Sequence, residues 1–287
     1  MTHPPTPGPI VVVGAGRAGT GISLALSQAG FPVLLVSRNA PRRIERIQVL
    51  PAGDPALPRG TAVWILAVPD RLVTATAASL ASGGFLGPSS VVGHLSGAMP
   101  SSVLADPARP SGGLFSAHPL VAFPPPIPPR PMPQGTTVLI EGDGTGTLVA
   151  GALFAAAGAE VSGVDPARKP LVHAAAVLSA NLAAALVWSA ADVLRHAGVP
   201  DPLAVSGRLL QSLADNLGDR PDATALTGPI ARGDVATVRS NLSALYQQDP
   251  SLGRLYRDLA LRLADAVHDA GSLPEESWRT IRAILEP

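Results

Sequence analysis

The stretch Ile10–Gly19, with the sequence IVVVGAGRAG, decides the fold of the first half of the chain. Its four apolar residues predict a buried strand, and the pattern from about Ala18 to Ala29 predicts a helix. A glycine at 14 permits a tight turn, one at 16 lets backbone N–H groups approach an anion, and one at 19 allows close helix packing. Unpaired N–H groups and the helix dipole favour phosphate at this turn. The residues expected at a bound diphosphate are Gly14, Ala15, Gly16, Arg17, Ala18 and Gly19.

Short apolar runs then alternate with helical stretches as far as Val164. Continuous apolar strands separated by helices are typical of a parallel sheet covered on both faces. Together with the glycine-rich loop, they predict an α/β fold that begins with a Rossmann domain, a doubly wound and mostly parallel sheet, over residues 1–164. The expected strands are Ile10–Val13, Val33–Val36, Ala62–Val68, Val91–His94, Gly113–Ala117, Thr137–Ile140 and Glu160–Val164.

From Asp165 the pattern is helical only. An aspartate followed by proline starts a helix efficiently, because the carboxylate caps N–H groups and proline fits the first turn. Such pairs begin at Asp165, Asp201 and Asp249, and the first predicts an unusually long helix over about Pro166–Ala197. We therefore expect an all-α C-terminal domain over residues 165–287 that binds substrate and forms a homodimer, since the alanine-rich helix allows close helix approach.

Composition excludes several classes of protein. The 287 residues include 21 basic and 21 acidic side chains and no cysteine. A net charge of zero gives no indication of a nucleic-acid partner, and disulfides and thiolate chemistry are impossible. The segment Ala174–Ala191 is uncharged, but its alanines and its polar Asn181 favour a helix buried in a domain or dimer core over a membrane span. We expect a cytoplasmic protein without a membrane partner.

The end of the second strand predicts which dinucleotide binds. NAD enzymes usually carry an acid there that accepts the ribose 2′-hydroxyl group. Here Ser37 and Arg38 occupy that position, and no acid follows before Glu45. A hydroxyl and a guanidinium suit a 2′-phosphate, so these two residues predict NADP(H) as the cofactor. For Arg42 and Arg43 we accept the other interpretation, that they are arginines on an exposed helix surface.

Two familiar catalytic patterns are absent. The single lysine, Lys169, has Asp165 four residues before it, whereas short-chain dehydrogenases need tyrosine there. It has His173 four residues after it, whereas β-hydroxyacid dehydrogenases need asparagine. The six histidines are scattered and form no metal signature, so no metal site is expected.

Ligands in open α/β sheets bind beyond the carboxyl ends of the strands. Val68 and Pro69 follow one strand and Ser96 another, so all three are expected at the nicotinamide half of the cofactor. Ser96 either holds the carboxamide or a substrate oxygen, or belongs to a polar strand-end turn. His118, at a further strand end, either binds substrate or bonds to the backbone.

His173 and Asn181 lie eight residues apart in the long helix, so α-helical spacing brings both to one groove. We interpret His173 as the proton donor and Asn181 as a residue that orients the substrate. The alternative is that the two side chains form a buried structural pair. In the loop that follows, Arg232 is a candidate to clamp a substrate carboxylate, with Thr227 beside it, and Asp234 is expected to cap the next helix.

Four segments, in this order after the glycine loop, carry a resemblance over nearly the whole chain. The chain resembles Rossmann-like proteins with a C-terminal DUF2520 domain, which are similar in architecture to pyrroline-5-carboxylate reductase, prephenate dehydrogenase and 6-phosphogluconate dehydrogenase. One departure is Val172, where that family often has tyrosine before the helical histidine. The segments are Gly93–Ala98, Ser116–Phe123, His173–Asn181 and Leu226–Asp234.

The resemblance implies an NADP oxidoreductase, and some of its members are associated with pantothenate synthesis. We therefore expect NADPH-dependent reduction of a small carbonyl or imine, with a carboxylate-bearing 2-oxo acid such as ketopantoate first and a pyrroline-type imine second. His173, Asn181, Ser96 and Arg232 are the expected catalytic residues. The alternative from another class is an NADP(H)-binding sensor or scaffold without catalysis.

Overall fold

A computed structural model describes residues 8–38, 43–60, 63–106, 111–125, 128–219 and 226–286. The chain forms two compact units, Met1–Ala180 and Asn181–Pro287. The helical part begins earlier than this division, at Pro166. The boundary at residue 164 therefore remains a proposal about domains, and the two units are described separately below.

The first unit is built on a nine-stranded sheet with the order β3-β4-β2-β1-β5-β6-β7-β8-β9. Most neighbouring strands are parallel, and the pairs β3–β4 and β7–β8 are antiparallel. This confirms the predicted mostly parallel α/β sheet. The strands are β1 Ile10–Val13, β2 Val33–Val36, β3 Arg43–Ile44, β4 Ile47–Leu50, β5 Val63–Leu66, β6 Val91–His94, β7 Gly113–Pro119, β8 Thr137–Gly142 and β9 Glu160–Gly163.

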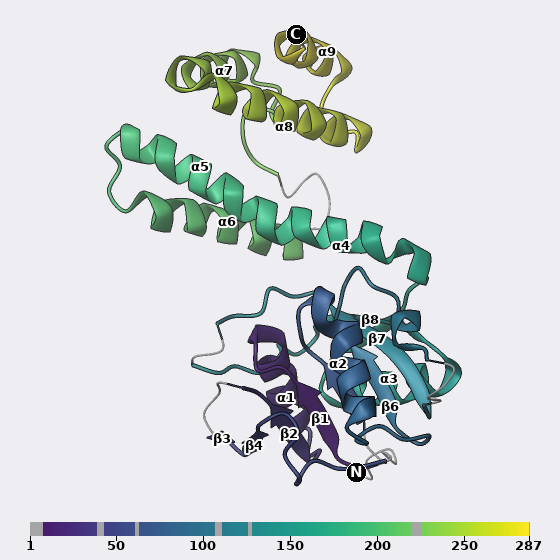
Figure 1. Cartoon of the computed structure of the whole chain (residues 1–287). Coiled ribbons are helices and arrows are strands. Elements are labelled where there is room, and N and C mark those ends of the chain that lie inside the picture. Colours follow the sequence, from purple (N-terminus) through teal and green to yellow (C-terminus); the bar gives the residue numbers. More distant parts are fainter. Residues whose placement is uncertain are drawn as a thin grey trace. The chain divides into compact units, whose positions relative to one another are not determined.

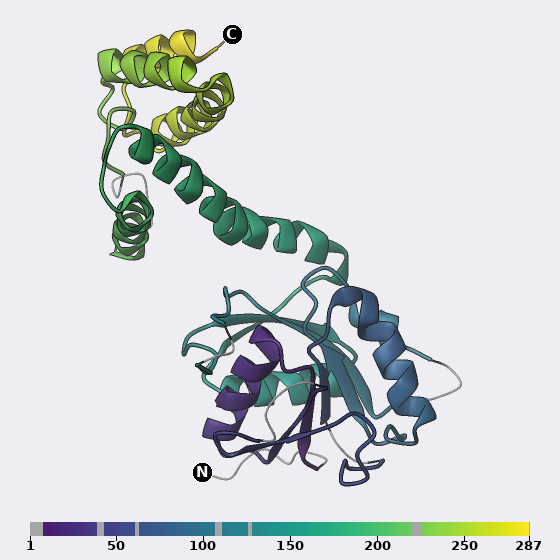
Figure 2. The ribbon, with the colours of Figure 1, turned by 60° about the vertical axis from the view of Figure 1, so that its left-hand side comes forward.

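Helices cover both faces of this sheet (Figures 1 and 2). The helices α1, Arg17–Gln28, and α3, Gly144–Ala156, pack on one face, where Ile22, Leu26 and Phe154 are fully buried. The helix α2, Asp70–Ser82, and the short helix η1, Ser101–Leu104, pack on the other face around Trp64. Burial from both faces explains why β1 and β5 consist of apolar residues without alternation.

The hairpin of β3 and β4 was not predicted. Glu45 turns the chain with a φ of 51°, and β4 pairs in parallel with β2. Arg43 therefore lies in an exposed strand, so the helix surface considered for it from sequence is wrong. Arg42 and Ala62 lie outside the described residues.

The long helix starts where the sequence predicts. Asp165 accepts a hydrogen bond from the N–H of Ala167, and helical structure continues through η2 Pro166–Arg168, α4 Lys169–Val177 and α5 Ala183–His196. A π-helical segment, η3 Leu178–Leu182, interrupts the α-helical spacing between α4 and α5. Such π turns are often found at functional sites.

Within the described residues, one helix, Pro166–His196, is long and apolar enough by composition to cross a membrane. Its most apolar window has a mean hydropathy of 1.8, and none of that window is buried within the chain. The chain itself therefore does not bury this window in a domain core, although Ala191, near the end of the helix, is buried. A dimer core remains a proposal, and one apolar helix does not by itself establish a membrane span.

The second unit contains α5, α6 Pro202–Asp219, α7 Val235–Gln248, α8 Pro250–Asp269 and α9 Glu275–Leu285. Asp234 caps α7 by accepting a hydrogen bond from the N–H of Thr237, and Asp249 caps α8 in the same way through Ser251. Both caps were predicted. A core around Val238, Ala264 and Ile281 holds α7, α8 and α9 together.

Candidate functional site

The glycine-rich loop has the geometry that a dinucleotide diphosphate requires. Gly14 has a φ of +114°, and a Cβ atom there would lie 2.3 Å from the carbonyl oxygen of Ala67. A Cβ on Gly19 would lie 1.9 Å from the carbonyl oxygen of Gly14. Both positions therefore exclude larger residues, for the turn and for helix packing respectively.

Gly16 differs from these two glycines. Among the described residues, no atom lies within 4 Å of where its Cβ would be, so these residues leave the space above Gly16 open. Gly16 is also the N-cap of α1, and no side chain caps that end of the helix. The first turn contains no acidic residue. Open space, unpaired N–H groups and the positive end of the helix dipole together make this turn suitable for an anion.

The end of β2 lies directly beside this loop, because the N–H of Gly14 donates to the carbonyl oxygen of Val36 at 2.9 Å. The next two residues are Ser37, which is half-buried, and Arg38, which is exposed. An exposed guanidinium at this position is free of the core and can reach a phosphate group. The arrangement is that expected for the adenosine end of a dinucleotide site.

A cavity of about 310 Å³ lies at the carboxyl ends of the central strands. The start of α1, the segment after β5, the segment after β6 and the end of β7 all contribute to its wall. His173, from α4, completes it. The lining residues are Ala18, Ala67, Val68, Asp70, Leu95, Ser96, Gly97, His118, Pro119, Val121, Phe123 and His173. Pro69, predicted beside Val68, is the N-cap of α2.

Two imidazole rings meet at Gly97 in this cavity. The rings of His118 and His173 are 5.5 Å apart between centroids and inclined at 63°. A Cβ on Gly97 would lie 2.5 Å from Nδ1 of His173 and 2.7 Å from Nε2 of His118. Only glycine therefore allows both rings to occupy these positions. The sequence predicted each histidine as a site residue but did not predict that Gly97 brings them together.

The surroundings of His173 favour one tautomer. Its Nδ1 atom is buried and has no hydrogen-bond partner in the part of the chain that the structure describes. A buried N–H without an acceptor is costly, so the proton of the neutral ring belongs on Nε2. Nε2–H is then the group that His173 offers to a ligand.

His118 has a different electrostatic environment. Burial lowers the pKa of His118 to about 4, and electrostatic interactions with His173 and Lys169 add to this effect, whereas Asp70 opposes it. His118 is therefore neutral at neutral pH. A neutral imidazole suits hydrogen bonding to a substrate better than supplying a proton to it.

Ser96 organises the strand-end turn. Its hydroxyl donates to Asp70 at 2.8 Å and accepts from the backbone N–H groups of Ala98 and Met99 at 3.2 and 3.0 Å. Its backbone N–H donates to Nδ1 of His94 at 3.2 Å. These bonds use the hydrogen and both lone pairs of the hydroxyl, so they favour the polar turn over direct cofactor contact, the two alternatives left open by the sequence.

A buried polar network beneath the cavity was missed from sequence. Lys169 is 1% exposed and Glu141 is 5% exposed, and their charged atoms are 4.0 Å apart. Lys169 also donates to Ser116 Oγ at 2.7 Å and to the carbonyl oxygen of Ser96 at 3.2 Å. The available signal was a lone lysine at the start of a long apolar helix, and sequence reasoning used it only to exclude enzyme classes.

Three predicted site residues belong to the second unit. Asn181 is exposed in the π segment, so it needs no buried partner, and the α-helical spacing that aligned it with His173 does not hold across that segment. Thr227 and Arg232 are also exposed. Their place at the site remains a proposal.

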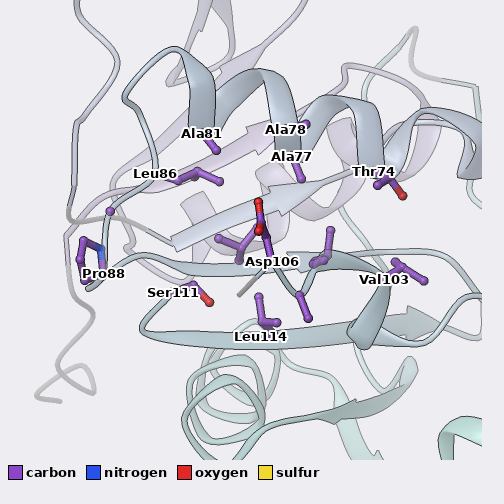
Figure 3. Close-up of a pocket in the computed structure, with 14 residues that line it drawn as sticks. Thr74, Ala77, Ala78, Ala81, Leu86, Pro88, Val103, Asp106, Ser111 and Leu114 are labelled. Carbon is purple, nitrogen blue, oxygen red and sulfur yellow. The ribbon is translucent and has the colours of Figure 1, made fainter. Parts of the chain in front are cut away.

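A second cavity, of about 500 Å³, lies under α2 (Figure 3). Figure 3 shows Ala77, Ala78 and Ala81 of α2 facing the strand that carries Leu114. Its walls are mainly apolar, and it does not include the glycine-rich loop or the two histidines. The smaller cavity at the strand ends is therefore the candidate site.

These features define the class as a Rossmann-fold protein with a helical C-terminal part. Family models refine this. Residues 6–119 match the Rossmann-like domain, and residues 136–263 match a domain of unknown function, DUF2520. The resemblance predicted from the sequence motifs is thereby confirmed. Among curated proteins, no sequence matches this chain.

Solved structures share the fold over most of the chain. Protein TM1727 from Thermotoga maritima is 22% identical with a TM-score of 0.70, and 91% of this chain and 98% of that chain are covered. BF3122 from Bacteroides fragilis, described as a candidate NADP oxidoreductase, is 23% identical with a TM-score of 0.69 and coverages of 90% and 98%.

A more distant neighbour is the pyrroline carboxylate reductase of Plasmodium falciparum with NADP bound. It is 9% identical, has a TM-score of 0.55, and the match covers 96% of this chain and 99% of that chain. At these identities the likeness shows the fold.

Proposed function

We propose that the protein is an NADPH-dependent oxidoreductase that reduces a small carbonyl or imine substrate. The observation that carries the proposal is that a loop suited to a diphosphate adjoins a cavity lined by two imidazoles. The loop at Gly14, Gly16 and Gly19 suits a diphosphate, and the cavity beside it presents the imidazoles of His118 and His173. A Rossmann domain holds its cofactor with the nicotinamide over the carboxyl ends of the strands, where this cavity lies.

The cofactor assignment rests on the end of β2. Arg38 is exposed next to Ser37, and neither is an acid that would favour the 2′-hydroxyl group of NAD. A guanidinium can bind the 2′-phosphate of NADP with two hydrogen bonds. The NADP-bound and NADP-described neighbours support the same assignment.

NADPH, when bound, supplies hydride to the substrate carbon. In our proposal the imidazolium form of His173 gives its Nε2 proton to the carbonyl oxygen or imine nitrogen and is left as a neutral ring, and neutral His118 donates a hydrogen bond that orients the substrate. Arg232, Thr227 and Asn181 stay in the proposal as residues that bind or orient the substrate, Arg232 through its carboxylate. Ketopantoate is our first choice of 2-oxo acid and a pyrroline-type imine is the second. We further propose a cytoplasmic homodimer.

The test is NADPH oxidation measured over a panel of 2-oxo acids and cyclic imines. We expect turnover above background with at least one carboxylate-bearing member, and its loss in His173→Gln. Saturable NADPH binding without turnover across the panel would instead support the alternative, an NADP(H) sensor.

A further inference from the structure

Lys169 lies directly beneath the site but has no part in the proposed chemistry. Its side chain is buried and does not line the cavity, so it does not touch a substrate or a nicotinamide there. Its ammonium group donates to Ser116 Oγ and to the carbonyl oxygen of Ser96. Burying such a charge is costly, so the structure must gain something from it or compensate for it.

Glu141 provides the compensation. Its carboxylate lies 4.0 Å from the ammonium nitrogen and accepts two hydrogen bonds of 2.7 Å, from the backbone N–H and the hydroxyl of Ser101. Burial lowers the pKa of Lys169, whereas Glu141 and Asp70 act to raise it. Because each charged group of this buried pair also makes two hydrogen bonds to its surroundings, the pair holds its neighbours in a defined arrangement.

Each acceptor of the ammonium group is close in sequence to Gly97 or to His118. Ser96 directly precedes Gly97, and Ser116 is two residues before His118 on β7. Lys169 itself is one helical turn before His173 on α4. We propose that Lys169 is a positioning residue, which ties α4 to the ends of β6 and β7 and thereby holds the two imidazoles against Gly97.

The effect of this residue on turnover rests on the proposed function, but its effect on the histidines does not. The positive charge of Lys169 is one of the causes that lower the pKa of His118, after burial and His173. Removing the charge should therefore raise that pKa in the protein without cofactor or substrate. This gives a readout that is independent of activity.

The main variant combines Lys169→Met with Glu141→Gln. Removing one partner of a buried ion pair leaves the other charge uncompensated, whereas removing both avoids that penalty. The matched control is Arg168→Met, which removes an exposed positive charge from the neighbouring position. Imidazole resonances are followed by NMR against pH in the full-length protein, and kcat and the Kd for NADPH are measured alongside.

We expect the double variant to titrate His118 at higher pH, and the control to match the wild type. We also expect kcat to fall about 100-fold with an unchanged Kd for NADPH, because an error of about 1 Å in a catalytic group costs about that factor. A folded double variant with wild-type His118 titration and wild-type kcat would overturn the proposal.

Two other outcomes are also decisive. If the wild type turns over no substrate in the panel, the proposed function fails, and the His118 titration alone decides the role of Lys169. If the double variant does not fold, Ser116→Ala takes its place, since it removes the 2.7 Å acceptor without removing a charge. We then expect a weaker nuclear Overhauser effect between the rings of His118 and His173, and an unchanged one would contradict the positioning role.

Discussion

Replacing Gly97 by alanine is the sharpest perturbation of the site. The added methyl carbon would lie 2.5 Å from Nδ1 of His173 and 2.7 Å from two ring atoms of His118, whereas ordinary contact begins at 3.4 Å. The rings must therefore retreat by about 1 Å to restore van der Waals contact. Gly97 does not have a positive φ, so backbone strain does not add to the effect.

The expected cost is about 1–3 kcal/mol of stability, typical of overpacking, and about a 100-fold loss in kcat. Urea unfolding measures the first, and NADPH oxidation with the substrate found in the panel measures the second. The Kd for NADPH should change little, since the adenosine and diphosphate positions are untouched. The control is Gly151→Ala in α3, where a Cβ meets no atom of the described residues within 4 Å. A folded Gly97→Ala protein with wild-type kcat would refute the role of the imidazole pair.

Three further predictions test other parts of the account. Arg38→Ala should raise the Kd for NADPH about 10- to 100-fold, because a hydrogen-bonded charge contributes about 1.5–3 kcal/mol, and should leave the Kd for NADH unchanged. An equal rise in the Kd values of both nucleotides would contradict the proposed contact with the 2′-phosphate. Since the folded-state pKa of His118 is lowered to about 4, its contribution to stability should be present above about pH 6.5 and be lost as the pH falls towards 4. In His118→Asn, the free energy of unfolding measured in urea should fall less over that pH range than in the wild type. An identical fall would contradict the lowered pKa of His118. Asp143→Ala should destabilise the first unit by about 1 kcal/mol in urea, because the carboxylate caps α3 through the N–H of Gly146 and also binds the N–H of Leu114; an unchanged midpoint would show that these bonds contribute nothing.

The sequence was sufficient to predict the features that local constraints determine. Gly14 and Gly19 sit where a turn and a helix crossing leave no room for a side chain, and the surrounding strand and helix reveal that context. Asp165, Asp234 and Asp249 cap helices through bonds to residues two or three positions ahead, so their roles are also visible in the sequence.

The features that were missed depend on contacts between distant residues. Gly97 has no special local pattern, and only the approach of His118 and His173 from other elements shows why it must be glycine. The burial of Lys169 is likewise a property of the folded unit, since most lysines are exposed. The hairpin of β3 and β4 is short and carries no alternating apolar pattern in its first strand, so it gave no strand signal.

The role of Asn181 shows how a sound rule can fail locally. Its predicted alignment with His173 assumed continuous α-helical spacing, and the π segment Leu178–Leu182 interrupts that spacing. An alanine- and leucine-rich sequence gives no signal that a π-helical segment, with about one extra residue per turn, will form.

Calorimetric titration of the full-length protein with NADPH and, separately, with NADH tests the central claim most directly. We predict one saturable site for NADPH per chain and weaker binding of NADH, because the loop at Gly14–Gly19 binds the diphosphate of either and Arg38 binds only the extra phosphate. Absence of heat and saturation with both nucleotides, or tighter binding of NADH, would contradict the account.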